Sequence, residues 1–195
     1  MKIVNDRVYF KLLLFGSALA GKTTTLEWFF NHLIPKDMKV TDSIHSIKTS
    51  FGQTLLFDFV PIQASQNIII RIYALTGQDY YLSTRRMFFE NVDGLFFIVD
   101  SQKKELEHNR EFVKEFQSYR ASLPELKSAA VVILYNKQDL PGAERPEVLS
   151  AQLGLETYPG LPVSAATGAN LSRAFTYMVS LILNRLKEAR ADDVQ

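Results

Sequence analysis

The sequence contains no cysteine. Disulfides, thiolate metal sites and cysteine nucleophiles are therefore excluded, and a reducing, cytoplasmic location fits this composition. Prenyl and palmitoyl anchors need a cysteine, and an N-myristoyl anchor needs a glycine after Met1, where Lys2 stands. We therefore expect no lipid anchor, and we expect any membrane association to go through a partner protein.

The sequence also lacks an excess of charge of either sign. Its 22 lysines and arginines nearly balance its 21 aspartates and glutamates, which leaves a formal net charge of +1. This balance predicts no attraction to nucleic acid or to anionic lipid. Long apolar runs are missing too, because the longest have only the length of a strand, so we expect no membrane span. The three histidines are isolated and lack the spacing of metal ligands.

Apolar, strand-like runs alternate with helical patterns along all 195 residues. Such alternation predicts an α/β fold, and the length suits one domain over residues 1–195. We expect three layers around a six-stranded, mostly parallel sheet. The expected strands lie near 8–15, 54–60, 67–75, 95–99, 130–135 and 161–164, and the expected helices near 22–33, 79–91, 103–122, 146–153 and 170–189.

Two connections between these elements are unusual in length, one short and one long. The second and third expected strands are separated by a short turn near Pro61, which predicts an antiparallel hairpin, because a parallel pair needs a longer crossover. Residues 36–52 are polar with only scattered apolar positions. A structureless loop of that length is usually functional or disordered.

The stretch Gly16-Ser-Ala-Leu-Ala-Gly-Lys-Thr23 lies between the first expected strand and the first expected helix. Strand, glycine-bounded loop and helix are the context of a phosphate loop. The glycines allow a tight turn, and the loop N–H groups meet a helix start, which favours anions. We expect Lys22 to reach the β- and γ-phosphates and the Thr23 hydroxyl to bind Mg²⁺. The expected nucleotide contacts here are Gly16, Ala18, Leu19, Ala20, Gly21, Lys22, Thr23 and Thr24.

Two further stretches fit recognition of a guanine base. Asn136-Lys-Gln-Asp139 directly follows the strand expected at 130–135, at the strand end where open α/β sheets bind ligands. The Asp139 carboxylate can accept hydrogen bonds from guanine N1–H and its exocyclic amine, whereas adenine would leave the carboxylate unpaired. Lys137 can lie along the base plane. The small residues of Ser164-Ala165-Ala166 allow a backbone N–H to approach guanine O6.

In this order and on these elements, the three stretches resemble the small Ras-like GTPases, and the resemblance covers nearly the whole chain. It implies a Ras-like G domain with the P-loop NTPase fold, binding GTP or GDP with Mg²⁺. Asn-Lys-Gln-Asp-Leu-Pro and Ile-Val-Asp-Ser are especially similar to the Arf branch. A closer resemblance is to the bacterial MglA family of cell-polarity and gliding GTPases. It is carried by Thr54-Leu-Leu-Phe-Asp-Phe-Val-Pro61, Thr76-Gly-Gln78, Val92-Asp-Gly94, Val99-Asp-Ser-Gln102 and Tyr135-Asn-Lys137.

The resemblance assigns roles to three residues outside the phosphate loop. Gly77 matches the glycine whose N–H contacts the γ-phosphate. Gln78 matches the glutamine that orients the attacking water, and with Lys22 it forms the expected catalytic set. Thr54 matches the first-switch threonine, which reaches Mg²⁺ only with triphosphate bound; its other interpretation is an ordinary β-branched strand residue.

The chain departs from the family pattern at several positions. Ras-like proteins usually carry an aspartate that steadies Mg²⁺ where Ala74 stands, although MglA proteins also lack it. Asp58 is either a substitute for it or a surface charge of the hairpin, and the sequence leaves both open. MglA proteins carry a catalytic arginine where Gln53 stands. Ala18 fills a position that is glycine in fast Ras-type enzymes. The departures at Gln53 and Ala18 predict slow intrinsic turnover.

The predicted function is a guanine-nucleotide switch with weak GTPase activity. By the resemblance, it acts in cell polarity or motility through activating, exchange and effector proteins that bind its switch regions, and its partners recruit it from the cytoplasm to a cell pole. Tyr80 and Arg85 are candidates for such a docking surface. A non-hydrolysing guanine-nucleotide scaffold is the alternative, favoured by Gln53 and Ala74. Asn136-Lys-Gln-Asp139 argues against a more distant alternative, an ATP-using P-loop kinase.

Overall fold

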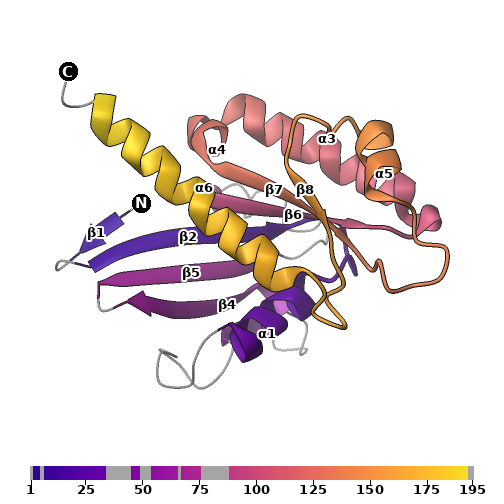
Figure 1. Ribbon diagram of the computed structural model, residues 1–195, viewed down its shortest axis with the longest axis horizontal. Coiled ribbons are helices and arrows are strands. Elements are labelled where there is room, and N and C mark those ends of the chain that lie inside the picture. The colour runs from indigo at the N-terminus through magenta and orange to yellow at the C-terminus, as the bar shows by residue number, and fades with distance from the viewer. Residues whose placement is uncertain are drawn as a thin grey trace.

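The computed structural model describes residues 2–4, 7–33, 45–48, 54–65, 67–75 and 88–192. Within these ranges one mixed sheet has helices on both faces (Figure 1). The strands are β1 (Lys2–Val4), β2 (Arg7–Phe15), β3 (His45–Lys48), β4 (Thr54–Ser65), β5 (Ile68–Leu75), β6 (Gly94–Asp100), β7 (Ala130–Asn136) and β8 (Gly160–Pro162). The helices are α1 (Lys22–His32), α3 (Leu106–Ser122), α4 (Pro124–Ser128), α5 (Pro146–Leu153) and α6 (Leu171–Asp192), with a 3-10 turn η3 (Lys103–Glu105).

The strand order is β3-β4-β5-β2-β6-β7-β8, with β1 paired to β2. From β5 to β8 every neighbouring pair is parallel, whereas β1, β3 and β4 pair antiparallel to their neighbours. The predicted α/β fold with a mostly parallel sheet is confirmed. The described residues contain eight strands rather than the expected six, because β1 and β3, with three and four residues, are too short to show a periodic pattern.

The predicted antiparallel hairpin is formed by β4 and β5, but its turn is not at Pro61. β4 continues through Pro61, which pairs with Arg71, as far as Ser65. Strand β3 pairs with β4 between Thr54 and Phe59, so Pro61 lies beyond that pairing. Proline is tolerated in an edge strand, because its missing N–H then deprives no neighbour of a hydrogen bond. Part of the loop expected over 36–52 is also regular, since β3 forms there against β4.

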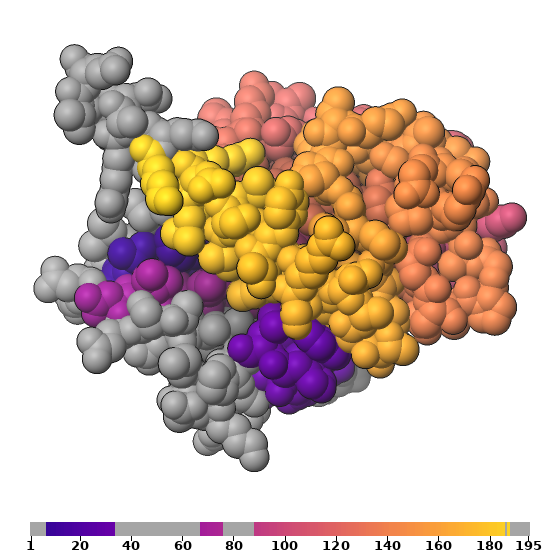
Figure 2. All heavy atoms as spheres, in the orientation of Figure 1, coloured from indigo at the N-terminus to yellow at the C-terminus, as the bar shows by residue number. Residues whose placement is uncertain are grey.

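The two faces of the sheet carry separate cores. One face packs against α1 and α6, and the other against α3, α4 and α5. Central strands β6 and β7 are buried along their whole length, as expected of parallel strands covered on both faces. Figure 2 shows α1 in indigo directly beside the golden segment that leads into α6. Helix α1 and the segment before α6 are therefore neighbours, with Trp28 of α1 against Gly168, although they are far apart in the sequence.

The predicted helices agree with the observed ones where both are described. The short helix α4 was not predicted; it begins at Pro124, a favoured first helical position. The helix expected near 79–91 lies almost entirely outside the described residues. Across the described part of the chain, no helix combines the length and the apolar character that a bilayer span requires.

Candidate functional site

The predicted phosphate loop connects the end of β2 at Phe15 to the start of α1 at Lys22. Gly16 and Gly21 have φ angles of 147° and 103°, the second in the left-handed region. A Cβ on Gly16 would lie 2.2 Å from the carbonyl oxygen of Ile98, and a Cβ on Gly21 would lie 2.2 Å from the amide nitrogen of Asn136. Both positions therefore require glycine for conformation and for space.

The Lys22 side chain is buried and folds back over this loop. Its Nζ donates to the carbonyl oxygens of Gly16 and Ser17, at 2.8 and 2.6 Å. The buried Ser17 hydroxyl has no hydrogen-bond partner among the described residues. Around the rim, Ala18, Leu19, Thr23 and Thr24 are exposed, whereas Ala20 is buried. The loop thus surrounds an ammonium group and presents exposed backbone and hydroxyl groups at the start of a helix.

Asn136, the last residue of β7, lies buried between two loops. Its Nδ2 donates to the Ala20 carbonyl oxygen at 2.7 Å, and its Oδ1 accepts from the Ala165 N–H at 2.8 Å. One side chain therefore ties the phosphate loop, the end of β7 and the segment after β8 together. Burial raises the pKa of the preceding Tyr135 above its usual value.

Lys137 follows in a left-handed conformation, with φ at 67°. Its Nζ lies 2.5 Å from Oδ2 of Asp100, a carboxylate that is almost fully buried at the end of β6. Gln102 also donates to this carboxylate through its backbone and side-chain nitrogens. Sequence reasoning did not propose Asp100 as a site residue. The sequence feature that could have indicated Asp100 is its position directly after the apolar run Leu95–Val99, at the carboxyl end of a strand.

Gln138 is a second residue that sequence reasoning missed. Its Nε2 donates to the Ser101 hydroxyl at 2.7 Å and to the Glu144 carbonyl at 2.9 Å, and its backbone N–H donates to Val163. These bonds fasten the turn after β7 to its neighbours on two sides. The next residue, Asp139, stands exposed at the tip of that turn.

The stretch 164–166 begins a tight turn before α6. Ser164 and Ala165 are buried and Ala166 is exposed. The sequence predicted a backbone N–H here that approaches guanine O6. The Ala165 N–H is engaged by Asn136, and the Thr167 N–H donates to the Ser164 hydroxyl at 3.1 Å. The N–H of Ala166 makes no hydrogen bond within the described residues, so it is the donor of this stretch that a ligand can use.

The residues expected near the γ-phosphate and the metal ion are only partly described by the structure. Gln53, Gly77 and Gln78 lie outside the described residues, as do Tyr80 and Arg85. Thr54 is the first residue of β4. Asp58 on β4 is the direct partner of Ala74 on β5, and Ala74, which is buried, also pairs with Leu14 on β2, two residues before the phosphate loop.

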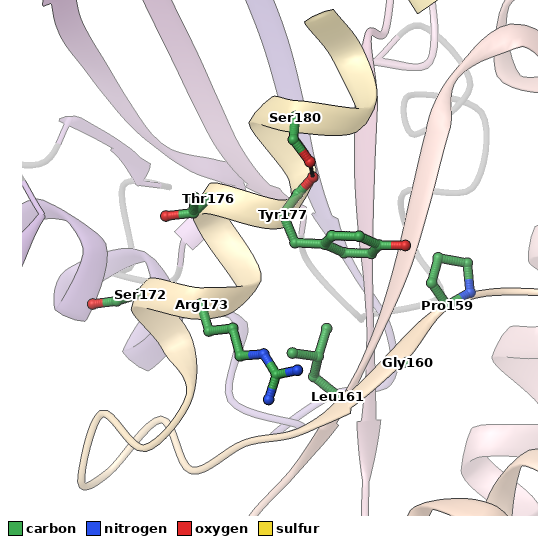
Figure 3. A pocket seen from close by; sticks show the side chains of 8 residues that line it. All are labelled: Pro159, Gly160, Leu161, Ser172, Arg173, Thr176, Tyr177 and Ser180. Atoms are coloured by element: carbon green, nitrogen blue, oxygen red, sulfur yellow. Dashed lines mark hydrogen bonds between the residues drawn. The ribbon is translucent and has the colours of Figure 1, made fainter. Parts of the chain in front are cut away.

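A cleft of about 710 Å³ lies apart from these loops, between α6 and β8 (Figure 3). Arg173 and Tyr177 extend from α6 toward Leu161 and Pro159 across it. None of the predicted nucleotide contacts lines this cleft. Its lining residues are Pro159, Gly160, Leu161, Ser172, Arg173, Thr176, Tyr177 and Ser180.

Comparison with known proteins identifies the family. The model of the ADP-ribosylation factor (Arf) family matches residues 1–182. The chain belongs to the Arf family of small GTPases. It is 30% identical over 186 residues to the mutual gliding-motility protein MglA of Myxococcus xanthus, covering 91% of this chain and 92% of MglA.

Structural comparison supports the same fold. The small GTPase Arl6 (BBS3) of Trypanosoma brucei, solved with the nucleotide analogue GppNp bound, superposes with a TM-score of 0.67. The alignment covers 91% of this chain and 99% of that one at 16% sequence identity. The predicted Ras-like fold and the predicted likeness to the Arf and MglA proteins are therefore confirmed, and the family's general role is that of a GTP-binding switch.

Proposed function

We propose that this chain is a guanine-nucleotide-dependent switch with weak intrinsic GTP hydrolysis. The observation that carries the proposal is the convergence of three segments, which follow β2, β7 and β8, at one end of the sheet. Asn136 links all three through two buried hydrogen bonds. The carboxyl ends of parallel strands are where open α/β sheets bind ligands, and this arrangement offers a phosphate cradle at one side and base-recognition groups at the other.

The residues present fit a guanine nucleoside triphosphate with Mg²⁺. The Ile98 backbone fills the space where a Cβ on Gly16 would lie, and the Asn136 side chain fills that space at Gly21. The ammonium of Lys22 donates to the carbonyl oxygens of Gly16 and Ser17 in the same loop. Thr23 and Thr54 are the residues that would hold the metal ion. When bound, Mg²⁺ neutralises charge on the β- and γ-phosphates.

The strand register supports Asp58 as the replacement for the Mg²⁺-steadying aspartate that is absent at position 74. The register places Asp58 on β4 directly opposite Ala74 on β5. We propose that Asp58 supplies from β4 the negative charge near Mg²⁺ that position 74 lacks on β5.

The hydrolytic mechanism that follows uses this chain's own residues. Loop N–H groups and Lys22 stabilise the charge that develops on the transferring phosphoryl group. Gln78 orients the attacking water, while Thr54 and Gly77 respond to the γ-phosphate, so its loss releases both switch segments. Gln53 is neutral where MglA proteins carry an arginine, and a neutral amide cannot match the charge of a guanidinium.

A non-hydrolysing scaffold that recruits partners in one nucleotide state is the second candidate. Two residues favour it, Gln53 and Ala74, because each replaces a charged group expected near the γ-phosphate or the metal. An ATP-using kinase is disfavoured by the arrangement around Asn136, Lys137 and Asp139. The likeness to MglA supports a role in cell polarity or motility, through partners that bind the switch segments and recruit the protein to a pole.

Guanine selectivity is expected to depend on Asp139, whose carboxylate stands at the tip of an anchored turn. Asp139→Asn should shift the preference from GTP toward XTP, because the amide can donate to the oxygen that xanthine carries in place of the guanine amine. Competition binding with GTP, XTP and ATP checks this. Equal affinity of the wild-type protein for ATP and GTP would contradict the assignment, and Glu144→Gln serves as a nearby control that leaves the base contacts intact.

Loss of the Asp58 charge is expected to weaken metal binding. Asp58→Asn keeps the shape of the side chain but should raise the free Mg²⁺ concentration needed to retain GTP by about 10- to 100-fold, the usual effect of removing a supporting group near a metal. Nucleotide release is measured during a chelator titration. The matched control is Asp93→Asn, since Asp93 accepts a hydrogen bond from the Lys11 N–H at the other end of β6. An unchanged Mg²⁺ requirement would show that Asp58 is only a surface charge.

Hydrolysis by the protein alone is expected to be slow. An arginine supplied to the γ-phosphate contributes about 10³- to 10⁵-fold in Ras-like enzymes, and Gln53→Arg should recover part of that factor in single-turnover assays. Gln78→Leu should abolish the remaining rate, because it removes the water-orienting amide. Wild-type hydrolysis as fast as that of an activated complex would refute the slow-switch proposal. A Gln78→Leu rate equal to wild type would show that Gln78 has no part in positioning water.

Partner recruitment is expected to depend on the bound nucleotide. Protein loaded with a non-hydrolysable GTP analogue should retain a set of polarity or motility proteins that GDP-loaded protein does not, because the γ-phosphate orders the switch segments. Quantitative mass spectrometry of proteins retained from an extract of the native organism measures this. Identical sets from the two nucleotide states would rule out switch-dependent recruitment.

A further inference from the structure

The turn that follows β8 is held from two sides. On its inner side, the Ala165 N–H donates to Asn136. On its outer side, Gly168 packs against the indole of Trp28 on α1. Gly168 has a φ of 82°, and a Cβ there would lie 2.1 Å from Nε1 and 2.5 Å from Cε2 of Trp28. The backbone of the turn is therefore in direct contact with the indole edge.

The turn itself is internally rigid. The Gly168 N–H donates to the Ser164 carbonyl at 2.8 Å, and the Ser164 N–H donates to the Ala169 carbonyl at 3.2 Å. The Thr167 N–H also donates to the Ser164 hydroxyl. These hydrogen bonds tie residues 164–169 together, so a group that holds Gly168 also supports the position of the Ala166 N–H.

The indole is a fixed support for this unit. Its ring stacks on His32 at 4.8 Å with an interplanar angle of 11°, and it meets Phe29 edge-on at 6.3 Å. Phe29 is fully buried and contacts Phe96 and Phe175 in the core. The same helix begins at Lys22 of the phosphate loop. Helix α1 therefore carries both Lys22, the expected phosphate contact, and Trp28, which packs against the turn.

We propose that Trp28 is a positioning residue for guanine recognition. By packing against Gly168, it holds the 164–169 turn in place, and with it the Ala166 N–H, toward the O6 edge of a bound guanine, and it thereby slows nucleotide release. Base release requires this turn to move outward, and the indole opposes that movement. The inference rests on the proposed binding of guanine nucleotide and adds a residue that touches no part of the nucleotide.

The test uses three diphosphates that differ in the groups on the base. GDP presents O6, the N1–H and the exocyclic amine; IDP lacks only the amine, whereas 2-aminopurine riboside diphosphate lacks O6 and the N1 proton. Trp28→Ala should speed GDP dissociation about tenfold, the equivalent of one hydrogen bond. Its preference for GDP over the 2-aminopurine analogue should fall by the same factor, whereas its preference for GDP over IDP should not change. Asp139→Asn should instead change both preferences, because Asp139 accepts from the exocyclic amine that IDP lacks and from the N1–H that the 2-aminopurine analogue lacks.

Two further variants separate positioning from loss of stability. Trp28→Phe keeps an aromatic wall and should restore most of the slow release. Leu33→Ala, at the far end of α1 from the phosphate loop, removes a half-buried side chain packed on the same core and should lower the unfolding midpoint without altering either ratio. If Trp28→Ala and Leu33→Ala changed the two ratios equally, the effect of Trp28 would be merely structural and the proposal would be overturned.

A double-mutant cycle tests the contact itself. Gly168→Ala should speed GDP release in the wild-type background, because its methyl group displaces the indole. In the Trp28→Ala background the added methyl group no longer meets the indole, so Gly168→Ala should speed GDP release by a smaller factor than in the wild-type background. Additive effects would overturn the proposal. Wild-type protein that binds no GDP would overturn the proposed function itself, whereas normal GDP release from Trp28→Ala would overturn only the role of Trp28.

Discussion

The amide side chain of Asn136 makes the two hydrogen bonds on which the geometry of the site depends. It joins the Ala20 carbonyl to the Ala165 N–H, across 116 residues of sequence on one side and 29 on the other. Both partners are backbone groups, so the link fixes the paths of two loops whatever side chains they carry. A buried amide left without partners costs about 1–3 kcal/mol per group. The phosphate loop, the end of β7 and the turn before α6 therefore hold their positions together.

An ion pair between Lys137 and Asp100 lies next to Asn136, at the ends of β7 and β6. Lys137 adopts a left-handed conformation, which costs a non-glycine residue of order 1–3 kcal/mol. The ion pair with the buried Asp100 and the anchoring of Gln138 offset that cost. Asp100 is accessible to Lys137 only because β6 and β7 end at the same level, with Asp100 paired to Asn136. The register of two fully buried strands thus places a carboxylate under the lysine and leaves Asp139 at the exposed tip.

The sequence predicts the elements of this site better than their connections. The loop at 16–23 and the turn at 136–139 are local patterns, and their flanking apolar runs place them on strand ends. Asp100, Gln138 and Trp28 were missed because their roles arise from contacts between segments far apart in the chain. The same reason explains β3, which forms by pairing with β4, and Pro61, which local turn chemistry favoured as a turn but which pairs within β4.

Two departures from the family pattern, at Gln53 and Ala74, belong to the segment around the β4–β5 hairpin, whereas a third, Ala18, lies in the phosphate loop. Base and phosphate groups belong to segments next to β2, β6, β7 and β8, where the central strands are buried on both faces. Ala74 belongs to the β4–β5 hairpin, on the other side of β2, and Gln53 is the residue before β4 in the sequence. No hydrogen bond described at Asn136 or Lys137 involves that hairpin. Substitutions in the hairpin can thus alter the groups around the metal and the γ-phosphate while Asn136 and Lys137 keep their geometry.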